Sequence, residues 1–342
     1  MASAKVVFRR RQVAWPLRCL MGILTDFVLG PTVWALGKAG KGDFVFRAIS
    51  RSQKRKLAGK FGRYVPSSHD IVIGVYAKSG TNWMMQIVQQ LLHHGRAEFD
   101  HIHSVVAWPE TKNDPALRHY AIPVEDETPW RNSPEGKRAI KTHLNWEHIP
   151  YSGEARYISV IRDPKDVFVS NYFFLRNMLP LPSVETWFRF FCSDDFYLFG
   201  SWAVNTAGFW AQRRRPNVLV LSFKAMKQDL EGTVRRVAEF LEVRLGSDEL
   251  KLVCEKASFD YMRTVDEKFE VWNIIPWHSK TRMMRNGRQG GSSELLSTDQ
   301  QRQMDEYFMG ELKRLGSDFP YAEFCNVTSP SDSFAVGPPQ RD

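Results

Sequence analysis

The stretch that decides the fold is Ile71-Val72-Ile73-Gly74-Val75-Tyr76-Ala77-Lys78-Ser79-Gly80-Thr81-Asn82-Trp83. Its first six residues form a short apolar, β-branched run, which is typical of a strand buried on both faces in a parallel sheet. A polar turn follows at 78–82, and from Trp83 to Leu92 the apolar residues recur at helical spacing. Strand, turn and helix together predict a βα unit, whose helix-opening N–H groups form an anion site.

The turn carries side chains suited to binding a phosphate or a sulfate. Gly80 permits a tight turn and a close approach of the backbone to a ligand. Lys78 adds a positive charge, and the hydroxyls of Ser79 and Thr81 add hydrogen-bond donors. The spacing does not satisfy the Walker A pattern Gly-x-x-x-x-Gly-Lys-Ser/Thr. On its own, the turn also fits a plain βα connection with a surface lysine.

Further βα units follow along the chain, with strand candidates at 138–142, 156–161 and 218–221. Alternating strands and helices predict an α/β fold of three layers around a central parallel sheet. Arg162 stands directly after the strand at 156–161, where its guanidinium can pair bidentately with a phosphate, and Ser170 on the next helix is a further donor. Two anion sites on separate units predict a ligand with two separated anionic groups.

Composition places the chain among globular proteins, with 342 residues of which 43% are hydrophobic and 25% are charged. No stretch repeats at a fixed period, which excludes solenoids and propellers. The four cysteines lie far apart without a Cys-x-x-Cys pair, which argues against a disulfide scaffold and favours a cytoplasmic location. We expect one catalytic domain at 67–322, an N-terminal extension at 1–66 and a disordered Ser- and Pro-rich tail at 323–342.

Positive charge is concentrated at the N-terminus. Residues 1–63 carry 14 Lys and Arg against Asp26 and Asp43, whereas the remainder carries 33 basic and 36 acidic residues. A nearly neutral body argues against a nucleic-acid partner. The apolar stretch 19–37 lies between basic clusters and is open to three interpretations: a helix packed on the body, a peripheral anchor at a membrane surface, or a span. The span is least favoured, because a charge such as Asp26 mid-membrane costs roughly 2.5–3.5 kcal/mol.

Five motifs follow one another between about residues 70 and 290. They are the turn at 76–83, Lys141-Thr142-His143-Leu144, the segment 162–172, Phe199-Gly200-Ser201-Trp202 with Gly208-Phe209-Trp210, and Arg285-Asn286-Gly287 with Gly290. In this order they resemble the motifs of the cytosolic-type sulfotransferase family, which uses 3′-phosphoadenosine 5′-phosphosulfate (PAPS). An ordered set of five motifs is far more specific than any one of them.

The resemblance implies a P-loop NTPase-like fold and transfer of a sulfuryl group from PAPS to a hydroxyl or amine, without a metal. It implies that His143 is the general base and that Lys78 and Lys141 are also catalytic. Apart from this context, His143 also fits a hydrogen-bonded core histidine. The cofactor-binding residues implied by the resemblance are Lys78, Ser79, Gly80, Thr81, Asn82, Trp83, Arg162, Ser170, Phe223, Ala257, Ser258, Phe259, Met262, Arg285, Asn286 and Gly287.

The acceptor side is indicated by aromatic residues, of which 13 lie within the 39 residues from 172 to 210. Such a cluster can wall a pocket for a lipophilic small molecule, although part of it must be core. We expect Lys141, Thr142, His143, Phe173 and Trp202 to contact the acceptor. Two alternatives stay open: a P-loop phosphotransferase that needs ATP and magnesium, and a non-catalytic nucleotide-binding membrane adaptor. The sequence indicates neither the acceptor's identity nor the oligomeric state.

Overall fold

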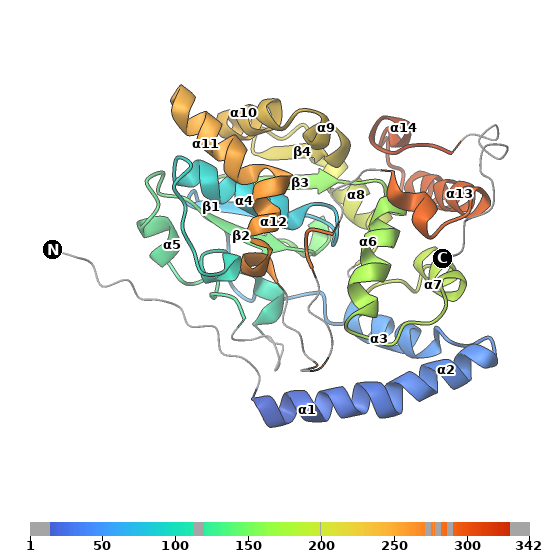
Figure 1. The fold of residues 1–342 in the computed structure, drawn as a ribbon. Coiled ribbons are helices and arrows are strands. Elements are labelled where there is room, and N and C mark those ends of the chain that lie inside the picture. The colour runs from blue at the N-terminus through green and yellow to red at the C-terminus, as the bar shows by residue number, and fades with distance from the viewer. Residues whose placement is uncertain are drawn as a thin grey trace.

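The computed structural model describes residues 14–112, 120–198, 200–270, 275, 277, 282–285 and 290–328. A parallel sheet in the order β2-β1-β3-β4 lies at the centre of these residues (Figure 1). Its strands are β1 (Asp70–Gly74), β2 (Arg138–Thr142), β3 (Arg156–Ile161) and β4 (Val218–Ser222). The predicted α/β class with a parallel sheet is confirmed.

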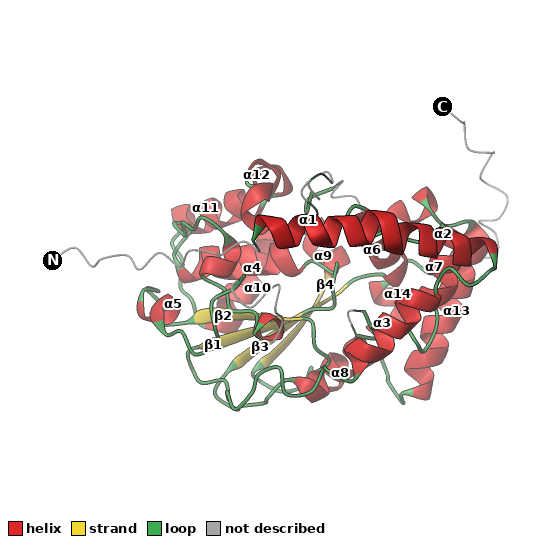
Figure 2. Ribbon diagram, turned by 90° about the horizontal axis from the view of Figure 1, so that it is seen from below, coloured by secondary structure: helices red, strands yellow, loops and turns green. Residues whose placement is uncertain are grey.

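Helices cover both faces of the sheet, so the fold has three layers (Figures 1 and 2). Successive residues of β1 enter two different hydrophobic clusters: Ile71 and Ile73 belong to one, and Val72 to the other. This alternation is what a strand buried on both faces requires, and it explains the continuous apolar run in the sequence. The first cluster includes residues of α4 (Thr81–Leu92), α10 (Leu230–Leu241) and α11 (Ser247–Ala257), and the second residues of α6 (Pro164–Arg176), α8 (Trp202–Ala211) and α13 (Thr298–Arg314).

The remaining elements are short or lie at the edges of the domain. The α-helices are α1 (Trp15–Ile23), α2 (Gly30–Lys38), α3 (Phe44–Lys54), α5 (Thr128–Arg131), α7 (Val184–Phe191), α9 (Phe223–Gln228), α12 (Phe259–Thr264) and α14 (Tyr321–Phe324). A π-helical segment, Leu24–Leu29, joins α1 to α2, and 3₁₀ turns occur at Ile102–Ser104, Pro109–Thr111, Trp146–His148, Asp266–Phe269 and Gly291–Glu294.

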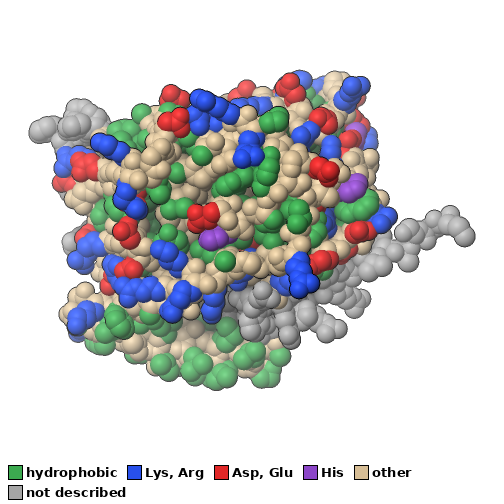
Figure 3. Space-filling model, turned by 180° about the vertical axis from the view of Figure 1, so that it is seen from behind, with side chains coloured by type: hydrophobic (Ala, Val, Ile, Leu, Met, Phe, Trp, Pro, Cys, Tyr) green, Lys and Arg blue, Asp and Glu red, His purple; other side chains and the backbone are tan. Residues whose placement is uncertain are grey.

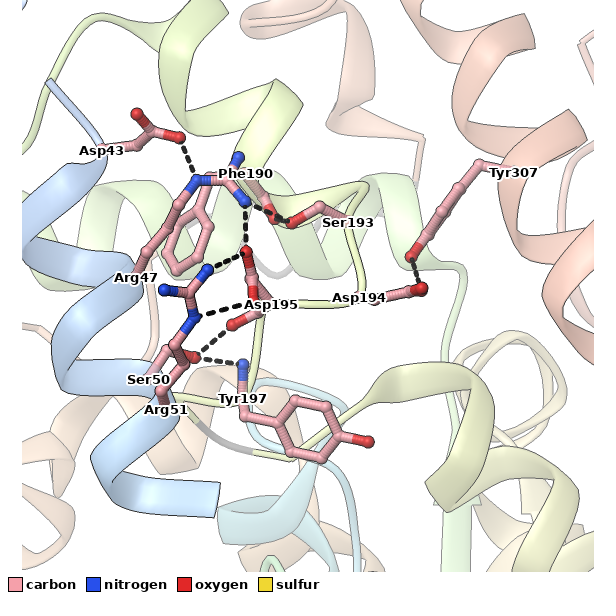
Figure 4. Close-up of polar contacts among 10 residues, drawn as sticks. All are labelled: Asp43, Arg47, Ser50, Arg51, Phe190, Ser193, Asp194, Asp195, Tyr197 and Tyr307. Carbon is pink, nitrogen blue, oxygen red and sulfur yellow. Dashed lines mark hydrogen bonds and ion pairs between the residues drawn. The ribbon is translucent and has the colours of Figure 1, made fainter. Parts of the chain in front are cut away.

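The N-terminal extension is attached to the domain through α3. Arg47 and Arg51 both reach the carboxylate of Asp195, at 2.8 and 3.1 Å (Figure 4). The hydroxyl of Ser50 donates to the carbonyl of Asp195 and accepts from the backbone N–H of Tyr197, each at 2.5 Å. These polar contacts fix α3 against the loop that follows α7.

The first residues of the expected tail pack on the domain. The backbone N–H of Asn326 donates to Asp163, and that of Thr328 donates to Asp305, both at 2.9 Å. The described, packed chain therefore extends to Thr328, beyond the boundary expected at 322. Residues 329–342 lie outside the described part of the chain.

Candidate active site

A cavity of about 340 Å³ lies where the chain leaves the carboxyl ends of the strands. Lys78 follows β1, His143 follows β2, Arg162 follows β3 and Phe223 follows β4, and all four line the cavity. Ligands of open α/β sheets bind at this edge. The volume falls within the range of small-molecule sites.

Most of the site residues expected from the sequence meet in this one cavity. They come from segments as much as 207 residues apart, from Lys78 to Arg285, yet each contributes to the wall. The predicted residues that line it are Lys78, Gly80, Thr81, Asn82, Trp83, Lys141, His143, Arg162, Ser170, Phe223, Phe259, Met262 and Arg285.

Three other predicted cofactor residues, Ser79, Ala257 and Ser258, lie behind the wall of the cavity and do not line it. The indole N–H of Trp83 donates to the carbonyl of Ala257 at 2.7 Å, which fixes the plane of the ring. The hydroxyl of Ser258 accepts from the backbone N–H of Tyr261 and caps α12. Ser79 is fully buried inside the turn. Asn286 and Gly287 lie outside the described residues.

The predicted acceptor residues Thr142, Phe173 and Trp202 do not line the cavity. Trp202 is buried in the core, where its ring lies 5.0 Å from that of Phe308 and its N–H donates to the carbonyl of Arg162 at 3.0 Å. It therefore positions the backbone of a cavity residue instead of forming the wall. The guanidinium of Arg285 lies over the ring of Phe173, with its Cζ atom 4.3 Å from the centre of that ring.

The turn after β1 has a backbone shaped for an anion. Lys78 adopts a φ of 68° and Gly80 a φ of 104°, both in the left-handed region. Left-handed residues of this kind occur in the backbone concavities that bind anions, and here the N–H of Ser79 between them donates to the carbonyl of Tyr76 at 3.0 Å. A Cβ at Gly80 would lie 2.9 Å from the Phe223 ring, so the position requires glycine for space as well as for conformation.

Unsatisfied polar groups in the turn fit a bound phosphosulfate. Among the described residues, the hydroxyls of Ser79 and Thr81 and the Nε of Arg162 are buried without a hydrogen-bond partner. A buried donor left unpaired costs about 1–3 kcal/mol. An anion seated on the turn would satisfy the two hydroxyls, and a second anionic group beside Arg162 would satisfy its Nε, so the residues present suit the two anionic ends of PAPS.

The cavity concentrates positive charge. Burial, followed by the nearby charge of Arg162, lowers the pKa of Lys78 to about 7. Burial also lowers the pKa of Lys141 to about 7, and its ammonium lies 3.4 Å from the centre of the Trp108 ring. The pKa of Arg162 is lowered by burial as well. An arrangement of buried like charges is relieved by a multiply charged anion, which restores the ordinary pKa of each lysine.

His143 is held in the form of a base. Its Nδ1 lies 2.7 Å from the carbonyl oxygen of Val75, and because a carbonyl only accepts, Nδ1 carries the hydrogen. Nε2 is therefore the basic nitrogen. Burial first, and then the charge of Lys141, lower the pKa of His143 to about 3. The ring is thus neutral at physiological pH.

Glu110 is a site residue that the sequence did not reveal. One carboxylate oxygen accepts from the backbone N–H of His143 at 2.6 Å and from the hydroxyl of Thr142 at 2.9 Å. Burial raises the pKa of this carboxyl. Glu110 lies in the short 3₁₀ turn Pro109–Thr111, whose sequence shows no periodic pattern and so carried no signal. Glu110 itself does not line the cavity; the unexpected residues that do include Trp108, Met178, Lys227, Met283 and Met284.

Nothing in the described part of the chain forms a metal centre: no group of three or more His, Cys, Asp or Glu side chains there could hold an ion. The ring nitrogens of His101 and His103 lie close to the backbone carbonyl oxygens of Glu270 and Val106, at 3.0 and 3.1 Å.

The chain is similar to known proteins over most of its length. The sulfotransferase domain family model matches residues 68–316. Sulfotransferase 2A2 of Mus musculus is 30% identical over 285 residues, and sulfotransferase 2A1 of Macaca fascicularis is 29% identical over 275 residues. Each of these matches covers 78% of this chain and 92% of the relative.

Solved structures show the same fold. Retinol dehydratase, in complex with androsterone and the inactive cofactor PAP, has a TM-score of 0.64 at 18% identity and covers 80% of this chain and 88% of that one. Mouse sulfotransferase SULT7A1, complexed with PAP, has a TM-score of 0.56 at 23% identity, with coverage of 77% and 90%. The match of the family model shows that the chain belongs to the sulfotransferase family, and the sequence-based prediction of a PAPS-dependent sulfotransferase is confirmed.

Proposed function

We propose that this protein transfers the sulfuryl group of PAPS to a hydroxyl or amine of a lipophilic small molecule, with His143 as general base. The observation that carries the proposal is the convergence on one cavity of a neutral histidine and, besides Lys227, four basic side chains to which we assign roles. Those cations are Lys78, Lys141, Arg162 and Arg285. A donor with two anionic ends needs such an arrangement.

The binding roles follow from position. The turn at 78–83 would hold the 5′ phosphosulfate through its N–H groups and hydroxyls, while Arg162, Ser170 and Arg285 would hold the 3′-phosphate. Trp83 and Phe223 lie edge to face with ring centres 5.6 Å apart and would flank the adenine. PAPS itself supplies a sulfuryl group joined to a phosphate leaving group.

The catalytic roles follow from charge. Nε2 of His143 accepts the proton of the acceptor hydroxyl as the oxygen attacks. Lys78 neutralises the charge that grows on the leaving phosphate, and Lys141 stabilises the transferring group. Groups preorganised in a buried site do this without reorientation, which is why positioning supplies most of the rate enhancement in such transfers.

The acceptor end of the cavity is apolar. Phe174, Leu175, Met178, Met283 and Met284 supply a wall without charge, and methionines adapt to irregular shapes. Retinol dehydratase has been solved with androsterone and with retinol, both lipophilic alcohols. These likenesses support a steroid-like or isoprenoid-like alcohol as the acceptor class.

The test is binding, followed by transfer. Calorimetry should detect tight binding of 3′-phosphoadenosine 5′-phosphate (PAP) by the wild type without metal, and Arg162→Ala should lose most of that affinity. Sulfate transfer from labelled PAPS should then be screened over steroids, retinoids, phenols and glycans. Binding of ATP with magnesium alone would favour the phosphotransferase alternative, PAP binding without any transfer would favour the adaptor, and a glycan acceptor would contradict the lipophilic class.

A further inference from the structure

A long apolar ridge is exposed on the N-terminal helix. Trp15, Phe27 and Trp34 are 68%, 73% and 64% exposed. Figure 3 shows apolar side chains gathered along the edge of the molecule that α1 and α2 form. Soluble proteins rarely leave a contiguous apolar surface of this kind without a partner. We call it the α1–α2 ridge, and its other exposed members are Leu17, Leu20, Ile23, Leu24 and Val28.

The opposite face of the same helix contacts the domain at a few positions. The Trp277 ring covers Gly22, where an added Cβ would lie 2.4 Å from it. The Trp277 N–H donates to Asp26 at 2.6 Å, and Val33 is only 3% exposed within the second cluster. The helix therefore lies flat along the domain (Figures 1 and 2).

This packing bears on how the helix would meet a membrane. Trp15–Lys38 is the one helix in the described residues that is long and apolar enough to cross a bilayer, with a mean hydropathy of 1.6. Crossing would require the helix to leave the domain and to carry Asp26 into the lipid, where a charge costs roughly 2.5–3.5 kcal/mol. Lying in the plane of the interface requires neither change.

Charge beside the ridge indicates the partner. Lys38 and Lys41 are exposed just after it in the chain, Lys54, Arg55 and Lys56 are exposed at the end of α3, and Figure 3 shows a row of Lys and Arg above the apolar edge. An apolar ridge bordered by cations matches the boundary between acyl chains and anionic headgroups. A second copy would present the same cations to the first, so charge opposes dimerisation through this surface.

The face of the helix opposite the ridge contacts two segments that also supply cavity residues. Gly30 lies close to Pro180, since a Cβ there would be 3.9 Å from the proline ring, and Met178 two residues earlier lines the cavity. Trp277, which packs on Gly22, is six residues before the cavity residue Met283. The helix that bears the ridge therefore contacts Pro180 and Trp277, which stand near the cavity residues Met178 and Met283 in the sequence.

We propose that the α1–α2 ridge docks in the plane of an anionic phospholipid surface and places the acceptor end of the cavity at the lipid boundary. The second half of this inference rests on the proposed lipophilic acceptor. The helix provides the apolar contact, the flanking cations provide attraction to the headgroups, and the acceptor enters from the bilayer without crossing water.

The test uses the full chain and vesicles of phosphatidylcholine with or without phosphatidylserine. In flotation, the wild type should bind the anionic vesicles, and added salt should weaken binding. The variant Leu20→Ser/Phe27→Ser/Trp34→Ser should lose affinity on the order of a hundredfold, because each side chain contributes buried apolar area. A matched control, Val65→Ser/Met309→Ser/Val327→Ser, removes three exposed apolar side chains outside the ridge and should bind as the wild type does. Unchanged PAP affinity would show that both variants are folded.

A second measurement tests acceptor delivery. Turnover of a sterol presented in anionic vesicles should fall in the ridge variant, whereas turnover of a water-soluble phenol should not. Wild type that fails to bind vesicles, or a ridge variant that binds them equally well, would overturn the docking. The docking would also be overturned if the ridge substitutions abolished a dimer of the protein and left vesicle binding unchanged. It would likewise be overturned if the vesicle-bound wild type resisted carbonate extraction, as a membrane-spanning protein does. If the wild type sulfated the soluble phenol but did not bind vesicles, the docking would be refuted and the proposed function would stand. If it bound vesicles but sulfated no acceptor, the proposed function would be refuted and the docking would stand.

Discussion

Nδ1 of His143 lies 2.7 Å from the carbonyl oxygen of Val75, which joins the end of β2 to the end of β1. The two residues are adjacent because β1 and β2 pair in parallel, with Gly74 opposite Thr142. The contact fixes both the tautomer and the orientation of the ring. The sequence around His143 also fits a core histidine, but the structure places its ring at the wall of the cavity with Nε2 as the nitrogen without a hydrogen.

Replacing His143 by Ala should lower kcat by about 10²–10⁴-fold, the usual contribution of a positioned general base. PAP affinity should remain near the wild-type value, because the proposed donor contacts come from other residues. Steady-state sulfate transfer and calorimetry measure the two quantities separately. Equal kcat in the variant and the wild type would show that His143 is not the general base.

PAP affinity should fall as pH rises above about 7. Burial lowers the pKa of Lys78 and of Lys141 to about 7, so that both lose their protons above this pH in the free protein. A bound anion favours the charged lysines and raises their pKa values, so binding at pH 8 should take up protons. Calorimetry in two buffers with different ionisation enthalpies measures this uptake. It should be smaller in Lys78→Met, and affinity that is constant from pH 7 to pH 9 would contradict the prediction.

Gly80→Ala should weaken both PAP binding and the fold. The φ of 104° strains any L residue, and the new Cβ would meet the Phe223 ring at 2.9 Å. A strained backbone position costs about 1–3 kcal/mol. Gly136→Ala is the matched control, since Gly136 also has a positive φ, of 60°, but no heavy atom within 4 Å of the added Cβ. The control should lose some stability and no PAP affinity, so an equal affinity loss in both variants would argue against the specific role of Gly80.

Glu110→Ala should lower kcat more than it changes PAP affinity. Its carboxylate accepts hydrogen bonds from the backbone N–H of His143 and the hydroxyl of Thr142. In the alanine variant both donors lose this acceptor. Glu110→Gln keeps an acceptor oxygen at the same place and should retain more activity than the alanine variant. Thermal unfolding serves as the control for stability. If the glutamine and alanine variants were equally impaired in kcat, the role of Glu110 would be its charge and not its acceptor geometry.

Local patterns determined the scaffold and much of the site. The apolar run at 71–76, the glycine-containing turn after it and the helical spacing from Trp83 act over a few residues, so the sequence itself displays them. The same holds for Arg162 at the end of its strand. Because parallel strands bring their carboxyl ends to one edge, local motifs were enough to predict that Lys78, His143 and Arg162 would meet.

Only the tertiary structure decided which side chains face the cavity, because that depends on packing between distant segments. Trp202 belongs to an aromatic-rich stretch, yet the core takes up its ring and only its N–H reaches Arg162. Glu110 meets His143 across 33 residues of chain, and Asp26 meets Trp277 across 251. In the sequence Asp26 only interrupts an apolar stretch. In the folded chain it marks the helix face that lies against the domain, and so leaves the opposite, apolar face to the solvent.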